Sequence, residues 1–170
     1  TRVYSTGLRM LDHVQDGIGE ITIVGQDLLG NTASRVVTFA MNSIDGLGGG
    51  SIFNSKLRVD VPPGSFEGRR NVALLPPPEV DTNRRGNGLS ASLSKSGWSK
   101  ALGSVYPANL NSVNPVQVAV KFNAPLSSKT GLFLSSVQGL KFLTDVSSVS
   151  AGEWRTVELS TLGSLHLVRD

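Results

Sequence analysis

Short stretches in which apolar and polar residues alternate, each stopped by glycine or proline, recur along this chain of 170 residues. The clearest is LRVDVPPGSF, in which Leu57, Val59 and Val61 are separated by charged residues. A period of two is that of a strand with one buried face. The prolines and the glycine end the pattern, because proline cannot donate to a strand ladder and glycine permits a reversal. The stretch therefore predicts a strand over 57–61 with a turn after it.

Further apolar or alternating segments follow at short and regular intervals. They lie at 71–75, 116–122, 132–134, 140–143, 154–159 and 165–168. The 19 glycines and 8 prolines predict many turns, and long runs of strong helix formers are missing. Short strands at this spacing are typical of a sandwich or an open barrel. We expect an all-β protein.

Residues 19–42 predict a β-hairpin. Apolar residues recur at Ile21 and Ile23 and again at 36–39, on either side of the loop DLLGN. Asx side chains bond their own backbone and tolerate left-handed conformations, which suits a turn. The hairpin and its loop resemble the last two strands of the bacterial immunoglobulin-like domains of surface and secreted proteins. The 18 residues before it are too few for the other strands, so the unit is truncated or is completed by another chain or by the second domain.

The segment NSIDGLGGGS is the strongest linker signal in the chain. Four glycines fall within the five residues 46–50, where an ordered strand or helix carries a high entropic cost. We expect two β-sandwich units joined by a Gly-rich linker. The expected boundaries are 1–45 for a partial immunoglobulin-like unit, 46–51 for the linker and 52–170 for the second domain.

Three segments of the second unit resemble those of ZU5-like β-domains in the same order. They are LRVDVPPGSF, VYPANLNSVNPVQVAVKF and GEWRTVELSTLGSLHLV. The match spans about residues 52–170 by pattern, and one inner Pro-x-Gly of that pattern is replaced by residues 108–110. The resemblance implies a ZU5-like sandwich that serves as a structural or interaction module, usually without an activity of its own.

Calcium is the one metal for which the chain offers candidate ligands. Asp12, Asp16 and Asp27 are oxygen donors in expected loops of the acidic first unit, and calcium prefers such ligands. The spacing of an EF-hand loop is missing, and ordinary turn chemistry explains the same residues. With no cysteine in the chain, disulfides and thiolate metal sites are excluded. No other cofactor is expected.

Neither histidine has a convincing catalytic context. His13 lies between two aspartates in a predicted turn, where a structural role is the simpler interpretation. Some ZU5-like domains cleave themselves at a His-Phe-Ser junction, but His166 is followed by Leu167 and Val168, so the attacking hydroxyl is missing. No Gly-x-Ser-x-Gly motif appears either. We expect that the protein is not an enzyme.

Arg84, Arg85 and Trp98 are the candidate ligand-binding residues. The arginines lie in a polar glycine-rich loop, and an exposed tryptophan stacks on sugar rings. Nucleic acid is not an expected partner, because aromatic content is 6% and no recognition motif accompanies the basic loops. Trp154 is expected in the core. The longest apolar runs are only a few residues, so we expect no membrane span in this chain.

These patterns together favour a non-enzymatic structural or assembly module of a larger extracellular or cell-surface protein, acting as a stalk, spacer or subunit-joining piece. The expected partners are other protein domains or subunits of a surface assembly. The alternatives are a module that binds a carbohydrate or another surface ligand, with a glycan as partner, and an accessory domain of a secreted hydrolase. The chain starts at a threonine without a signal segment, which suggests a processed product or a fragment.

Overall fold

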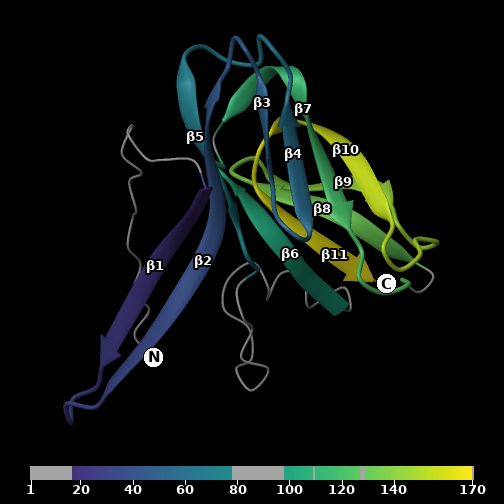
Figure 1. Ribbon diagram of the computed structural model, residues 1–170. Helices are drawn as coiled ribbons and strands as arrows, with labels where there is room; N and C mark the ends of the chain where they lie inside the picture. Colours follow the sequence, from purple (N-terminus) through teal and green to yellow (C-terminus); the bar gives the residue numbers. More distant parts are fainter. Residues whose placement is uncertain (1–16, 78–97, 109, 127–128, 170) are drawn as a thin grey trace.

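The computed structural model describes residues 17–77, 98–108, 110–126 and 129–169, and its regular elements there are all strands (Figure 1). Eleven strands follow in order: β1 (Gly17–Gln26), β2 (Thr32–Asp45), β3 (Gly50–Phe53), β4 (Leu57–Val61), β5 (Arg69–Leu75), β6 (Trp98–Tyr106), β7 (Asn111–Lys121), β8 (Thr130–Ser136), β9 (Gly139–Asp145), β10 (Trp154–Thr161) and β11 (Ser164–Arg169). The all-β prediction is confirmed. Within these residues, no helix is long and apolar enough to cross a bilayer.

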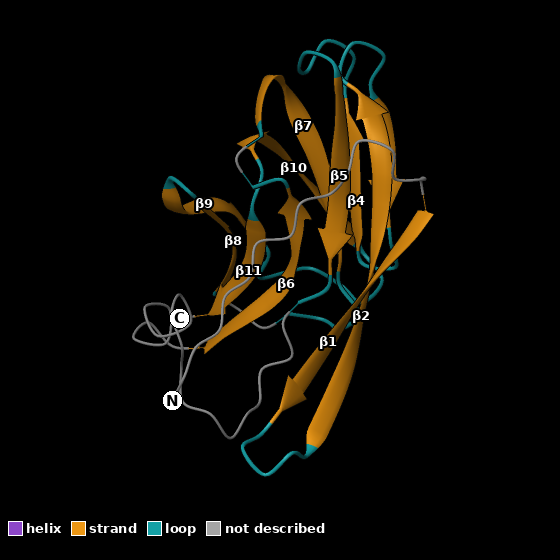
Figure 2. Ribbon diagram, turned by 90° about the vertical axis from the view of Figure 1, so that its left-hand side faces the viewer, coloured by secondary structure: helices purple, strands orange, loops and turns teal. Residues whose placement is uncertain are grey.

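The strands form two antiparallel sheets that pack face to face as a β-sandwich (Figures 1 and 2). The larger sheet has seven strands in the order β1-β2-β5-β6-β11-β8-β9. The smaller has four in the order β10-β7-β4-β3. The edge strands of the smaller sheet are therefore β10 and β3, and β1 is one edge of the larger sheet.

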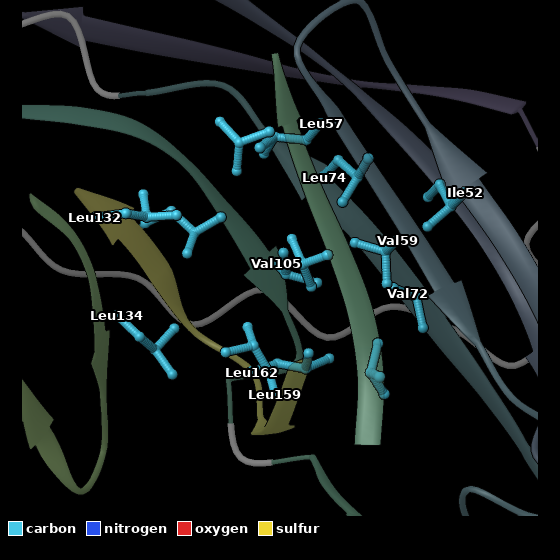
Figure 3. Close-up of a cluster of buried hydrophobic side chains, with 14 of the residues drawn as sticks. Ile52, Leu57, Val59, Val72, Leu74, Val105, Leu132, Leu134, Leu159 and Leu162 are labelled. Atoms are coloured by element: carbon cyan, nitrogen blue, oxygen red, sulfur yellow. The ribbon is translucent and has the colours of Figure 1, made fainter. Parts of the chain in front are cut away.

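The core lies between the sheets and follows the alternation of the sequence. Leu57, Val59 and Val61 on β4 are 1%, 0% and 3% exposed, as predicted. On the neighbouring β7, every second residue from Val116 to Val120 is equally buried. Figure 3 shows Leu57 and Val59 close to Val72 and Leu74 of the seven-stranded sheet, and all four belong to one core cluster. Each fully buried apolar side chain contributes about 1.5–3 kcal/mol relative to an exposed one.

The turn after β4 is anchored to β7. The Ser65 hydroxyl donates to the Pro62 carbonyl oxygen over 2.6 Å, and the Asn114 side-chain amide donates to that of Pro63 over 2.9 Å. Gly64 has a φ of 75°, a left-handed value that favours glycine. The predicted strand stop is thus a turn held by a strand nearly fifty residues further along the chain.

The first four residues of the glycine-rich segment, 46–49, form a tight turn between β2 and β3, and residues 50–51 begin β3. The Gly46 amide donates to the Gly68 carbonyl over 2.8 Å, and the Gly49 amide donates to that of Asp45 over 2.7 Å. Ile44 before the turn and Ile52 after it belong to one core cluster. A flexible linker is therefore not what the described structure contains at this point. The division of the chain into independently folding units at 1–45 and 52–170 stays a prediction.

β2 is 14 residues long and belongs to two different environments. Its last six residues, from Ala40, pair with β5, so this end lies inside the sandwich. Residues 32–39 pair only with β1 among the described strands. Figure 1 shows the resulting two-stranded arm extending well beyond the sandwich. We call residues 17–39, comprising β1, the turn and the outer part of β2, the ribbon. The predicted hairpin is confirmed, and β5 completes it on one side.

Candidate functional site

The ribbon carries an unusual share of exposed apolar surface. Six of its large apolar side chains are more than half exposed: Ile18, Ile23, Val24, Leu28, Leu29 and Val36. Monomeric soluble proteins rarely expose contiguous apolar patches of more than a few hundred Å², and larger ones mark interaction sites. The ribbon is therefore the first candidate for a functional surface.

The tip of the ribbon is a well-ordered turn that presents two leucines to solvent. One oxygen of Asp27 accepts hydrogen bonds from the Leu29 and Asn31 amides, both over 2.9 Å, and its other oxygen accepts one from the Asn31 side chain over 2.8 Å. These bonds, led by that of the Asn31 side chain, lower the pKa of Asp27. Leu28 is fully exposed and Leu29 nearly so. The turn thus holds two apolar side chains away from the rest of the molecule.

The two faces of the ribbon differ in composition. One face carries Ile21, Ile23, Val37 and Phe39, interrupted by Arg35. The Phe39 ring lies against Gly19, where a Cβ would overlap the ring. The opposite face alternates apolar residues with threonine, serine and Glu20. One face is thus predominantly apolar over its whole length.

A second candidate surface is the outer face of the four-stranded sheet. Trp154 on β10 is 42% exposed there, and Phe53 on β3 is 70% exposed at the opposite edge. The expectation that Trp154 lies in the core is wrong, because the alternation of β10 places Val157 and Leu159 inward and Trp154 outward. The Lys121 ammonium lies 5.8 Å from the centroid of the tryptophan ring, a cation–π contact.

The polar residues of this outer face form a row between the two aromatic side chains. Arg58 pairs across the sheet with Phe53 on one side and with Ala119 on the other. Its guanidinium lies 2.8 Å from an Asp60 carboxylate oxygen. The hydrogen bond to Asp60 and its charge raise the pKa of Arg58, which stays positively charged. We call Trp154, Lys121, Arg58 and Phe53 the aromatic face.

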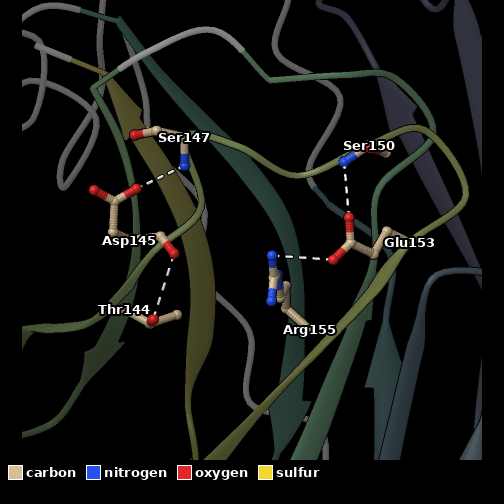
Figure 4. Close-up of polar contacts among 6 residues, drawn as sticks. All are labelled: Thr144, Asp145, Ser147, Ser150, Glu153 and Arg155. Atoms are coloured by element: carbon tan, nitrogen blue, oxygen red, sulfur yellow. Dashed lines mark hydrogen bonds and ion pairs between the residues drawn. The ribbon is translucent and has the colours of Figure 1, made fainter.

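The loop that leads into Trp154 is fixed by two carboxylates (Figure 4). Glu153 accepts a hydrogen bond from the Ser150 amide over 2.9 Å and forms an ion pair with Arg155 over 3.0 Å. Asp145 accepts a hydrogen bond from the Ser147 amide over 2.6 Å. The hydrogen bonds to Ser147 lower the pKa of Asp145. The start of β10, and with it the tryptophan, is held in place by these contacts.

Two hollows lie on the described part of the sandwich. One of about 190 Å³ lies between β8, β9 and β10, and one of about 130 Å³ lies at an end of the sandwich, where Lys56, Lys100 and Lys121 form part of its lining. The described lining of both contains neither a histidine nor a carboxylate. His166 lies on the outer side of β11, opposite Phe133, and burial lowers its pKa. Its Nε2 is buried without a hydrogen-bond partner.

Of the candidate site residues singled out from the sequence, the structure describes the side chain of Asp27 alone. Asp12, Asp16, Arg84 and Arg85 lie outside the described residues, as does the side chain of Trp98, whose backbone begins β6. Both carboxylate oxygens of Asp27 are engaged in its own turn. The part of the chain described here contains no cluster of three metal-ligating side chains.

Sequence reasoning anticipated an incompletely paired first unit, but it missed the exposed apolar side chains of the ribbon and the aromatic face. The signal for the first was two leucines in the middle of a predicted turn, where polar residues are usual. The signal for the second was the alternation along β10. The positions two and four residues after Trp154 are polar, which places Trp154 on the solvent-facing side with them. No protein-family model matches this chain, and no curated protein matches it significantly.

Proposed function

We propose that this chain is a non-enzymatic structural or assembly module of a larger extracellular or cell-surface protein, and that it joins other protein domains or subunits through the ribbon. The observation that carries this proposal is the projecting pair of strands with its exposed apolar side chains. The resemblances of residues 19–42 to bacterial immunoglobulin-like domains and of residues 52–170 to ZU5-like domains support the proposed setting.

A two-stranded ribbon has too few strands to be stable without further contacts. An isolated pair of strands is marginally stable in water, and three or more strands with an apolar face are needed for independent stability. The outer edge of β1 has no partner among the described strands. It also lacks the lysines and prolines that commonly protect an edge from pairing. Addition of a strand from a partner would satisfy the edge and widen the two-stranded ribbon into a larger sheet.

The proposal is tested by measuring the mass of the chain in solution together with limited proteolysis. We expect cleavage at the ribbon, near Leu28 or Leu29, when the chain is alone, and protection when a partner or a second subunit is bound. A monomer whose ribbon resists proteolysis at every concentration would contradict an assembly role, because such a ribbon would need no partner.

A second candidate function is the binding of an acidic carbohydrate at the aromatic face. An exposed tryptophan offers its ring to the C–H face of a sugar, and Lys121 supplies positive charge beside it. Arg58, paired with Asp60, lies on the same face two strands away. A sheet face bounded by two exposed aromatic side chains suits an extended ligand better than a small one.

A glycan array decides between the two functions. We expect binding of acidic glycans that is lost in Trp154→Ala and weakened in Phe53→Ala. Phe142→Ala is the matched control, because Phe142 is an equally exposed aromatic residue on the other sheet. Absence of any binding by the unaltered chain would exclude this second function and leave the assembly role intact.

A further inference from the structure

The structure assigns the edge of β1 that no described strand pairs with to a second copy of this chain: we infer that two ribbons pair through antiparallel β1 strands about a two-fold axis at Thr22. This inference rests on the proposed assembly role and names the partner. It begins from the sequence of β1, in which one set of alternate positions is symmetric about Thr22. Gly19 and Gly25 lie three residues to either side, and Ile21 and Ile23 lie one residue to either side.

A two-fold axis makes this symmetry useful. In an isologous antiparallel pair, residues equally far from the axis on opposite sides lie opposite each other. With Thr22 on the axis, each Ile21 faces Ile23 of the other copy and each Gly19 faces Gly25 of the other copy. Cross-strand pairs of β-branched residues stabilise a sheet. A slip of two residues in either direction would place one of these isoleucines opposite a glycine and the other opposite its own copy.

The faces of the two ribbons also match in this arrangement. Ile21 lies beside Val37 on β2, and Ile23 lies beside Arg35. Pairing therefore places four isoleucines at the centre of the apolar face of a four-stranded sheet. At each end of this cluster Gly25 of one copy, with open space above it, faces Gly19 of the other, which the Phe39 ring covers. A sheet of four strands with one apolar face has the minimum size for independent stability, which a pair of strands lacks.

Charge does not oppose the pairing. Glu20 is the only charged residue of β1, and it faces Val24 of the other copy. The two Glu20 positions are offset by four residues along the strands, or about 14 Å. That separation exceeds the screening length of about 8 Å at physiological ionic strength. Because the ribbon extends beyond the sandwich (Figure 1), antiparallel pairing places the two sandwiches at opposite ends of the joined sheet.

The test uses disulfide cross-linking in the full chain, which contains no cysteine of its own. Facing residues of antiparallel strands have Cα atoms about 4.5–5.5 Å apart, within the range that a disulfide spans. We expect Thr22→Cys to form a covalent species of twice the 17.9 kDa chain mass under mild oxidation. Glu20→Cys or Val24→Cys alone should remain uncross-linked, whereas an equal mixture of these two should cross-link.

A second pair of variants tests the same axis without cysteine. Thr22→Lys puts two like charges opposite each other at the axis, which destabilises a sheet pair. We expect it to raise the dissociation constant of the dimer at least about tenfold, equivalent to ~1.4 kcal/mol. Thr38→Lys is the matched control, because Thr38 is an exposed threonine on the same face of the ribbon but on β2. It should leave the dissociation constant unchanged.

Two results would overturn the inference. One is a monomer at the highest soluble concentration with no cross-linking of Thr22→Cys. The other is cross-linking of Val24→Cys alone as efficient as that of Thr22→Cys, which would indicate another register or random collision. Limited proteolysis separates this failure from that of the proposed function. A monomer whose ribbon is cleaved still needs a partner of another kind, whereas a monomer with a resistant ribbon needs none.

Discussion

The ribbon and the sandwich are built from the same kind of sequence but are stabilised in different ways. On β4 the alternating apolar residues face a second sheet and are almost completely buried, whereas on β1 Ile18, Ile23 and Val24 are mostly exposed. Both regions consist of paired strands, and among the described residues only the sandwich has a second layer. Side-chain burial between two layers therefore stabilises the sandwich and is missing from the ribbon.

Truncating one leucine to alanine in each region tests this difference in stability most directly. Leu57→Ala removes a side chain that is 1% exposed from the core, and we expect the free energy of unfolding to fall by about 2–5 kcal/mol. Leu28→Ala removes a fully exposed side chain at the ribbon tip and should change it by less than about 0.5 kcal/mol. Urea unfolding followed by circular dichroism measures both. Equal effects would mean that the ribbon is packed as tightly as the sandwich.

A second pair of variants asks whether the glycine turn belongs to the sandwich. Gly49 has a φ of 74°, and a Cβ there would lie 2.6 Å from the Val61 carbonyl oxygen. We expect Gly49→Ala to lower the free energy of unfolding by about 1–2 kcal/mol from the left-handed conformation alone, with crowding added. Gly48→Ala is the control, because the nearest atom to its Cβ would be 3.6 Å away. A flexible linker at 46–51 would instead tolerate both changes equally.

The sandwich should also respond to pH through His166, whereas the described ribbon contains no histidine. Burial lowers the pKa of His166, so the folded state prefers the neutral ring. The free energy of unfolding is therefore highest above the ordinary histidine pKa of about 6.5, and it decreases as the pH falls through the lowered value. We expect this loss to be reduced in His166→Leu, measured by urea unfolding near pH 7 and near pH 5. A loss of the same size in both proteins would assign it to other groups.

The smallest effect is expected at the ribbon tip. The pKa of Asp27 is lowered by its hydrogen bonds to Asn31 and to the backbone. The turn is therefore most stable above the ordinary aspartate pKa and loosens as the pH falls through the lowered value. In an NMR titration, the Leu29 and Asn31 amide signals should shift with a midpoint below the ordinary aspartate value. In Asp27→Asn that transition should be missing, and its persistence would assign it to another carboxylate.

Local patterns predicted the strands well because their signals are local. The bounds of β4 and the turn at Asp27 follow from alternation and from Asx chemistry within a few residues. The glycine segment could not be interpreted in this way. What makes it a tight turn is the bond from Gly46 to Gly68, more than twenty residues away, and glycine-rich composition fits a linker and a turn alike.

The surfaces were harder to predict than the strands, for reasons that differ between them. The alternation along β10 places Trp154 on the exposed face. The prediction instead followed the general preference of tryptophan for the core. The projection of the ribbon depends on where the pairing of β2 with β5 begins: only the residues from Ala40 onward pair with β5. That register joins segments about thirty residues apart, and no local pattern specifies it.

Amide hydrogen exchange measured at several protein concentrations tests the central claim most directly. The account predicts that the β1 amides that do not bond to β2, such as those of Thr22 and Val24, exchange much faster than those of Val59 and Val118 in dilute solution. It also predicts that the β1 amides become protected as the concentration rises, while the sandwich amides do not change. If the β1 amides were as protected as those of Val59 at every concentration, the ribbon would be stable without a partner, and the account would be contradicted.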